Sequence, residues 1–123
     1  MSDKYIGMDV HQATTAIGVA DSQGRHLMES IVETKASSIR EVIQGLSGTL
    51  HVTFEEGVHA QWLFDLLQPH VAKLVVCDPR RNKLLQSGNK ADKVDAWKLA
   101  DLLRANLLRP VYHGQQGMRI LKE

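Results

Sequence analysis

Four carboxylates have the types and positions needed for chemistry on a phosphate group. Asp9 ends one apolar run and Glu55 ends another, while Asp92 and Asp95 open a helix-like stretch. Acids at the ends of separate buried elements can converge, and converging carboxylates repel one another unless a cation lies between them. Carboxylate oxygens are preferred ligands of Mg²⁺, and paired Mg²⁺ ions promote displacement at phosphorus. The pattern therefore predicts a metal site for phosphodiester chemistry.

Each of these acids also has a structural interpretation. Asp9 could cap a turn, since Asp is common after strands. Asp92 and Asp95 could cap a helix and offset its dipole, although their spacing would also place both on one helix face. Glu55 and Glu56 are adjacent, so on a strand they would point to opposite faces and only one could face the site. The residues alone leave the choice between Glu55 and Glu56 open.

Other arrangements that could carry chemistry are weaker. The chain has neither Gly-x-x-x-x-Gly-Lys nor Gly-x-Gly-x-x-Gly, the loops that hold nucleotide phosphates. His11 follows closely after Asp9 and could form an acid–base pair with it, but a lone surface histidine is the default interpretation. Cys77 ends an apolar run and is expected in the core rather than as a nucleophile. As the one cysteine of the chain, it also excludes an internal disulfide.

Hydrophobic periodicity and turn signals predict the elements that must position these acids. Five strands are expected, over residues 4–10, 13–20, 26–33, 50–55 and 73–77. Three helices are expected, over residues 37–46, 58–68 and 92–106. Apolar stripes of the last two helices are expected at Trp62, Leu63, Leu66 and Leu67, and at Val94, Trp97, Ala100, Leu103 and Leu107.

The order of these elements predicts an α/β fold. Short links favour an antiparallel meander of the first three strands, and the later strand–helix repeats favour two strands parallel to the first. The expected architecture is a mixed five-stranded sheet with helices on both faces. Ligands of such sheets bind beyond the carboxyl ends of the parallel strands, where Asp9 and Glu55 are expected.

Composition and charge limit the class of protein. A chain of 123 residues with 43% hydrophobic residues can form one packed domain. Neither a signal peptide nor an apolar run of about 18 residues is evident, so we expect a cytoplasmic protein.

Net charge is +1, yet residues 1–72 hold four basic and nine acidic side chains, and residues 73–123 hold eleven basic and five acidic side chains. This asymmetry favours a nucleic-acid partner. The basic residues expected to contact its backbone are Arg80, Arg81, Lys83, Lys90 and Lys93.

Four segments, taken together, resemble one protein family. They are Ile6-Gly-Met-Asp-Val-His11, Thr53-Phe-Glu-Glu-Gly57, Val75-Val-Cys-Asp-Pro-Arg80 and Gly88-Asn-Lys-Ala-Asp-Lys-Val-Asp-Ala96. In this order and spacing they are similar to the N-terminal domain of DEDD transposases of the insertion-sequence one-ten family. The resemblance implies an RNase H-like (RuvC-like) fold. It further implies a RuvC-like DEDD catalytic domain over residues 1–113 and the start of a truncated helical linker over residues 114–123.

The resemblance also has implications for activity and partners. It implies that Asp9, Glu55, Asp92 and Asp95 are catalytic acids that bind Mg²⁺ or Mn²⁺, with two ions expected, and it favours Glu55 over Glu56. Strand cleavage and transfer in DNA transposition is the activity implied. Family members carry a second domain with a catalytic serine, pair their DNA substrates through a structured guide RNA and act as oligomers. Recombination is therefore expected to need the second domain.

Two rival functions stay open at this point. A catalytically incomplete fragment could bind DNA or RNA without cutting it. A sugar kinase or actin-like ATPase also begins with a strand that ends in Asp, but that class needs a Gly/Thr-rich phosphate loop after the first hairpin. The segment His11-Gln12-Ala13 does not supply such a loop.

Overall fold

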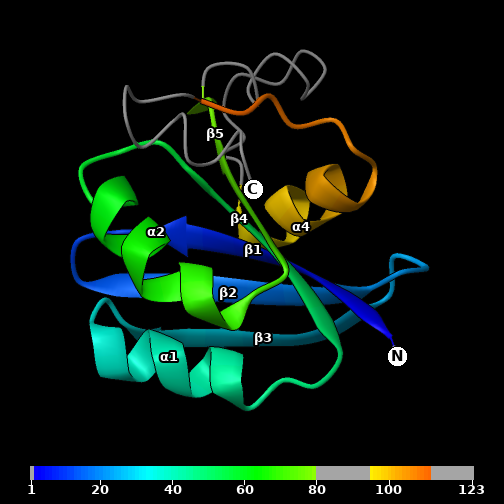
Figure 1. Cartoon of the computed structure of the whole chain (residues 1–123), viewed down its shortest axis with the longest axis horizontal. Helices are drawn as coiled ribbons and strands as arrows, with labels where there is room; N and C mark the ends of the chain where they lie inside the picture. Colours follow the sequence, from blue (N-terminus) through cyan, green and yellow to red (C-terminus); the bar gives the residue numbers. More distant parts are fainter. Residues whose placement is uncertain (1, 80–94, 112–123) are drawn as a thin grey trace.

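The fold is a mixed five-stranded sheet with helices packed against it (Figure 1). The computed structural model describes residues 2–79 and 95–111. Its strands are β1 (Asp3–Val10), β2 (Thr14–Asp21), β3 (His26–Glu33), β4 (Thr49–Glu55) and β5 (Lys73–Cys77). Its helices are α1 (Ala36–Gln44), α2 (Ala60–Leu67), the 3₁₀ helix η1 (Gln68–His70) and α4 (Ala96–Arg104). All five predicted strands are confirmed.

The strand order across the sheet is β3-β2-β1-β4-β5. Short turns join β1, β2 and β3 into an antiparallel meander, whereas β4 and β5 run parallel to β1. The turn between β2 and β3 is closed by Asp21, whose Oδ1 accepts hydrogen bonds from the backbone N–H groups of Gln23 and Arg25, both at 2.9 Å. These bonds, above all the one from Arg25, hold the pKa of Asp21 below its ordinary value. The predicted mixed topology is confirmed.

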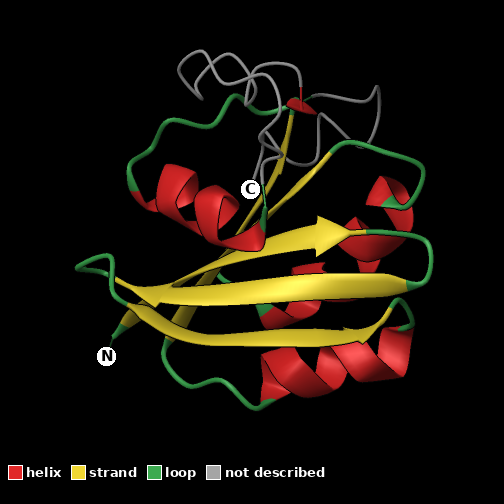
Figure 2. Ribbon diagram, turned by 180° about the vertical axis from the view of Figure 1, so that it is seen from behind, coloured by secondary structure: helices red, strands yellow, loops and turns green. Residues whose placement is uncertain are grey.

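One face of the sheet carries the larger hydrophobic core. Alternate residues of β1 and β4 point to this face, including Ile6, Met8 and Phe54, and all three are buried. Helix α1 contributes Ile39 and Ile43 to the same core, and α2 contributes further residues. Both helices therefore cover the same side of the sheet, and the reverse view in Figure 2 places them behind the strands.

Helix α4 covers the opposite face and lies in front of the strands in Figure 2. Gly7 of β1 and Gly18 of β2 are partners in the register of the sheet, so together they leave a stretch of that face without side chains. A Cβ atom on Gly7 would lie 2.6 Å from the backbone nitrogen of Ala100, and one on Gly18 would lie 3.0 Å from the Trp97 ring. The backbone of α4 therefore packs directly on the backbone of the sheet. The prediction of helices on both faces is confirmed.

The apolar stripe of α2 differs from the predicted one. Trp62 was expected in the core but is 38% exposed, whereas Phe64 is 4% exposed. The helix also begins at Ala60, two residues after the predicted start, because His59 is its N-cap. The position of Phe64 beside Leu63 and Leu67 turns the buried face away from Trp62.

The stripe of α4 was predicted in part: Ala100 and Leu103 are buried as expected, whereas Trp97 is only partly buried. Its buried residues are Ala96, Leu99, Ala100 and Leu103. Leu107 was expected to be buried, but it lies beyond the helix and is 53% exposed. The prediction included Trp97 and missed Ala96 and Leu99, because the glycines of the sheet let the helix backbone at Ala96 and Ala100 approach closely. Val94 and the rest of residues 92–94 lie outside the described part of the chain.

Candidate functional site

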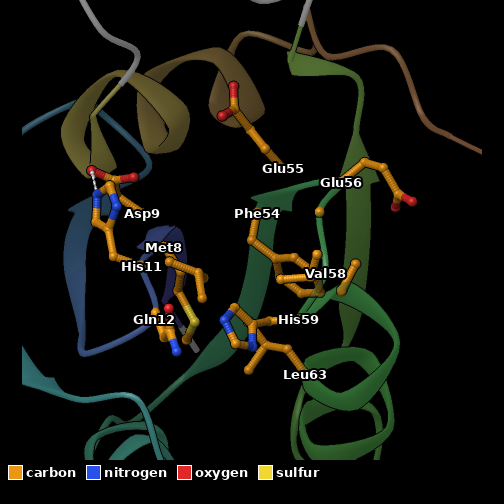
Figure 3. A pocket seen from close by; sticks show the side chains of 13 residues that line it. Met8, Asp9, His11, Gln12, Phe54, Glu55, Glu56, Val58, His59 and Leu63 are labelled. Carbon is orange, nitrogen blue, oxygen red and sulfur yellow. Dashed lines mark ion pairs between the residues drawn. The ribbon is translucent and has the colours of Figure 1, made fainter.

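Asp9 and Glu55 are placed by the register between β1 and β4. Gly7 is the partner of Thr53, and Met8 is the partner of Phe54, in a parallel ladder. Asp9 and Glu55 are the next residues along the two strands, directly after the last pair of this ladder. Since side chains alternate along a strand, both acids share the face on which Gly7 meets α4. In Figure 3 the side chains of Asp9 and Glu55 lie on the side of the sheet that α4 covers, whereas the side chain of Glu56 points away from them.

Helix α4 directs its N-terminus toward this end of the sheet. Near its start Ala96 approaches Gly7, and toward its end Arg104 lies 3.1 Å from the position of a Cβ on Gly24, in the turn after β2. The helix therefore runs from the carboxyl end of β1 toward the amino end. A helix N-terminus carries a partial positive charge, which favours ionised acids close to it.

Asp95 is the N-cap of α4. Its backbone is extended, and its Oδ1 accepts a hydrogen bond of 2.9 Å from the backbone N–H of Lys98. The capping interpretation of this residue is therefore confirmed. Asp95 precedes α4, so it is not part of the helix on which the shared face was predicted. Asp92 lies outside the described residues, so the relation between the two acids stays a prediction.

Asp9 also has a close neighbour that the sequence interpretation set aside. Nε2 of His11 lies 3.2 Å from Oδ2 of Asp9, and the two side chains are 49% and 24% exposed. The expectation of a lone surface histidine is therefore wrong. The alternation of side chains along an extended segment was the signal that could have found the pair, because residues two apart share a face. An imidazole in this position orients the Asp9 carboxylate.

An open cavity of about 520 Å³ begins at these acids and extends past the ends of β1 and β4. It is lined by residues 8–12, residues 54–60 and Leu63. Three of these residues, Gln12, Val58 and His59, were not singled out from the sequence. They belong to loops that are far apart along the chain and meet only because β1 and β4 are neighbours.

The structure tests the prediction for Cys77 but not the predictions for the basic residues. Cys77 is fully buried, and its Sγ lies 3.6 Å from Oγ1 of the buried Thr53, so its place in the core is confirmed. The basic residues Arg80, Arg81, Lys83, Lys90 and Lys93 lie outside the described residues. Within residues 2–79 and 95–111, no three His, Cys, Asp or Glu side chains are close enough together to hold a metal ion. No helix in the same ranges is long and apolar enough to cross a membrane.

The mixed sheet, its parallel strands and its two helical layers define an α/β domain of the RNase H-like class. The sequence model of the DEDD transposases of IS110 type, described as transposase, matches residues 6–123. The chain belongs to this family, and it is a DNA transposase domain. Transposases act on DNA, and those of the DEDD type generally use divalent metal ions.

Other comparisons add little to this assignment. No curated protein matches the chain. Among solved structures, gluconate kinase from Lactobacillus acidophilus shares 18% sequence identity over 48% of this chain, with a TM-score of 0.37. The chain covers 16% of that kinase. A likeness of this extent carries no argument about fold or activity.

Proposed function

We propose that this chain supplies the metal-dependent site of a DNA transposase that cleaves and transfers phosphodiester strands. The observation that supports the proposal is the position of Asp9 and Glu55 directly after the last pair of the β1–β4 ladder, Met8 and Phe54, at the end of the sheet toward which α4 directs its N-terminus. Asp95 caps that N-terminus. The same geometry favours Glu55 over Glu56.

The donor set is suited to Mg²⁺ or Mn²⁺, since carboxylate oxygens are the ligands that both ions prefer. The described acids do not complete the set, so the proposal includes Asp92 as the fourth ligand and oxygens of the DNA phosphate. Two divalent ions, when bound, would polarise the scissile phosphate and activate the attacking group.

The acids proposed as metal ligands have different roles. Asp9, on the central strand β1, would hold the divalent metal, and His11 keeps its carboxylate in orientation. Glu55 would contribute a second carboxylate ligand from the end of β4. Asp95 uses Oδ1 to cap α4 and presents Oδ2 as a ligand, so the cap fixes the side chain in place.

We assign DNA contacts to Arg80, Arg81, Lys83, Lys90 and Lys93, which would bind the phosphate backbone without sequence preference. A guide RNA, further copies of the chain, a RuvC-like form of the site and a second, serine-bearing domain are likewise part of the proposal. Support for them comes from the family to which the chain belongs.

Titration calorimetry with Mn²⁺ tests the site directly. Wild type, Asp9→Asn and Glu55→Gln are compared with Asp65→Asn, which changes an exposed acid of α2 outside the cavity. Binding should be lost or weakened at least tenfold in the first two variants and unchanged in the third. Equal Mn²⁺ binding by wild type and Asp9→Asn would refute the proposed site.

A second function, nucleic-acid binding without cleavage, is favoured by one observation. Residues 73–123 hold eleven basic and five acidic side chains, an excess of positive charge that suits a nucleic-acid backbone. A gel shift and a nuclease assay on one preparation separate the two functions, with single- and double-stranded DNA as probes. Binding that persists in EDTA, without cleavage when Mn²⁺ is added, would favour the binding function.

A further inference from the structure

Helix α4 rests on a part of the sheet that offers few side chains to hold it. Gly7 lies against the helix backbone at Ala96 and Ala100, and Gly18 lies against the Trp97 ring. Side chains that interlock across an interface fix the position of a helix along its own axis, and glycines supply none. The axial position of α4, which carries Asp95 at its N-cap, is therefore set largely by contacts on its two flanks.

The two flanks of α4 are held in different ways. On one flank Leu99 and Leu103 pack with apolar residues of β5. On the other flank Trp97 and Asp101 both contact His26, the first residue of β3. Residues four apart lie one above the other on the same side of a helix. A single side chain of the sheet therefore contacts two successive turns of α4.

The two contacts of His26 restrain the helix in different directions. Its ring stacks on the Trp97 ring, with centroids 4.0 Å apart and 8° between the planes. Its Nε2 lies 3.4 Å from Oδ1 of Asp101, and the His26 and Asp101 side chains are 41% and 43% exposed. The stack fixes the distance between ring planes, and the polar contact fixes the edge of the imidazole. A displacement of α4 along its axis would disturb both contacts at once.

A β-bulge in β3 directs His26 toward α4. The register of β2 and β3 passes from the pair Val19–Met28 to the pair Ala20–His26, so Leu27 is an extra residue. With regular alternation, His26 would share the face of Met28, which packs against the core beneath α1 and α2. The bulge turns His26 to the opposite face and leaves Leu27 48% exposed. A distortion that exposes a leucine to redirect one histidine indicates a specific role for that histidine.

We propose that His26 is a positioning residue for the metal site. It holds α4 through Trp97 and Asp101, so that Asp95 stays within reach of an ion at Asp9. The inference rests on the proposed function, since it takes Asp95 to be a metal ligand.

The distance of His26 from the site means that it acts only through the helix. Across the sheet His26 is level with Ala20 and Tyr5. Asp9 lies four residues further along β1 than Tyr5, about 13 Å at the rise of a β-strand. His26 therefore touches no reacting group, and its effect on the site must be transmitted by α4.

The test measures Mn²⁺ binding by titration calorimetry in wild type, His26→Ala and His26→Phe. Urea unfolding of each variant first identifies conditions in which every protein is folded. His26→Ala should weaken Mn²⁺ binding about tenfold, the lower end of the range for residues that orient metal ligands. His26→Phe keeps a ring that can stack on Trp97, so it should restore most of the affinity.

His51 offers a matched control. It stacks on Tyr5, with centroids 4.7 Å apart and 11° between the planes, and its Nε2 lies 3.2 Å from Oδ1 of Asp3. These contacts are of the same two kinds, but they join β4 to β1. His51→Ala should therefore lower the free energy of unfolding without changing Mn²⁺ affinity. In NMR spectra, the amide shifts of Gly7 and Ala96 should change in His26→Ala and stay unchanged in His51→Ala.

The outcomes separate this inference from the proposed function. Equally tight Mn²⁺ binding by His26→Ala and wild type overturns the positioning role, even when binding depends on Asp9. Equal losses of affinity in His26→Ala and His51→Ala overturn it too, because they would reflect stability alone. A loss confined to His26→Ala and reversed in His26→Phe supports it. Mn²⁺ binding that is independent of Asp9 refutes the metal site and the inference together.

Discussion

Substitution of Gly7 by alanine should weaken the protein more than any change of similar size on its surface. The new methyl group would lie 2.6 Å from the backbone nitrogen of Ala100 and 2.7 Å from Cβ of Leu99, and it would also meet the carbonyl oxygen of Ala96. Two of these atoms belong to the helix backbone and cannot rotate away. The whole of α4 must therefore move away from the sheet.

The size of the effect follows from the cost of overpacking, about 1–3 kcal/mol for an extra methyl group in a packed interior. Gly7→Ala should lie at the upper end, about 3 kcal/mol, since the obstacle is backbone. Gly18→Ala should cost about 1 kcal/mol, because its nearest neighbour is the Trp97 side chain, which can shift. Gly45→Ala is the control. Its methyl group would come no closer than 3.4 Å to any neighbouring atom, and the change should stabilise the protein by about 0.4–1 kcal/mol.

Urea denaturation followed by tryptophan fluorescence measures all three variants, since Trp97 reports on α4. The free energy of unfolding should rank in the order Gly45→Ala, wild type, Gly18→Ala and Gly7→Ala, from most to least stable. A Gly7→Ala protein as stable as Gly45→Ala would show that α4 does not pack on β1 as described. A loss of stability in Gly18→Ala equal to that in Gly7→Ala would refute the distinction between backbone and side-chain obstacles.

Two further predictions concern single carboxylates. Asp95→Ala removes the N-cap of α4 and should lower the free energy of unfolding by about 0.5–2 kcal/mol, whereas Asp95→Asn, which retains a capping oxygen, should lose less in the same urea experiment. Asp21 has a lowered pKa in the folded protein, so its contribution to stability is present above the pKa of the unfolded chain and is lost as pH falls through the folded pKa. Between pH 5 and pH 3, thermal unfolding should show a steeper loss of stability in wild type than in Asp21→Asn; parallel curves would contradict this assignment.

Much of the fold could be predicted because local signals agree with the tertiary structure. The run Lys73–Cys77 is apolar and β-branched, and it forms the strand expected of it. The packing of α4 could not be predicted in the same way. Its buried face is set by Gly7 and Gly18 on the sheet, and hydrophobicity within the helix favours Trp97 instead of Ala96.

The candidate site was predictable to a similar extent. Asp9 is the next-to-last residue of β1 and Glu55 is the last residue of β4, so their place at one end of the sheet followed from the order of elements. The contact between His11 and Asp9 could have been found from their spacing of two residues along an extended segment. The cavity that Gln12 and His59 both line depends on two loops far apart in the chain, so it is not visible in a local pattern. The position of Asp92 stays a prediction.

The alternation of side chains along β1 and β4 has a consequence for the kinds of mutation that this domain can tolerate. On β1, Ile6 and Met8 fill the core, while Gly7 and Asp9 form the seat of α4 and the site. A substitution alters the side chain at one of these positions. Deletion or insertion of a single codon before Asp9 affects all of them, because a slip of one residue turns every side chain to the opposite face of the sheet. We expect length changes in these strands to be far rarer among functional variants than substitutions.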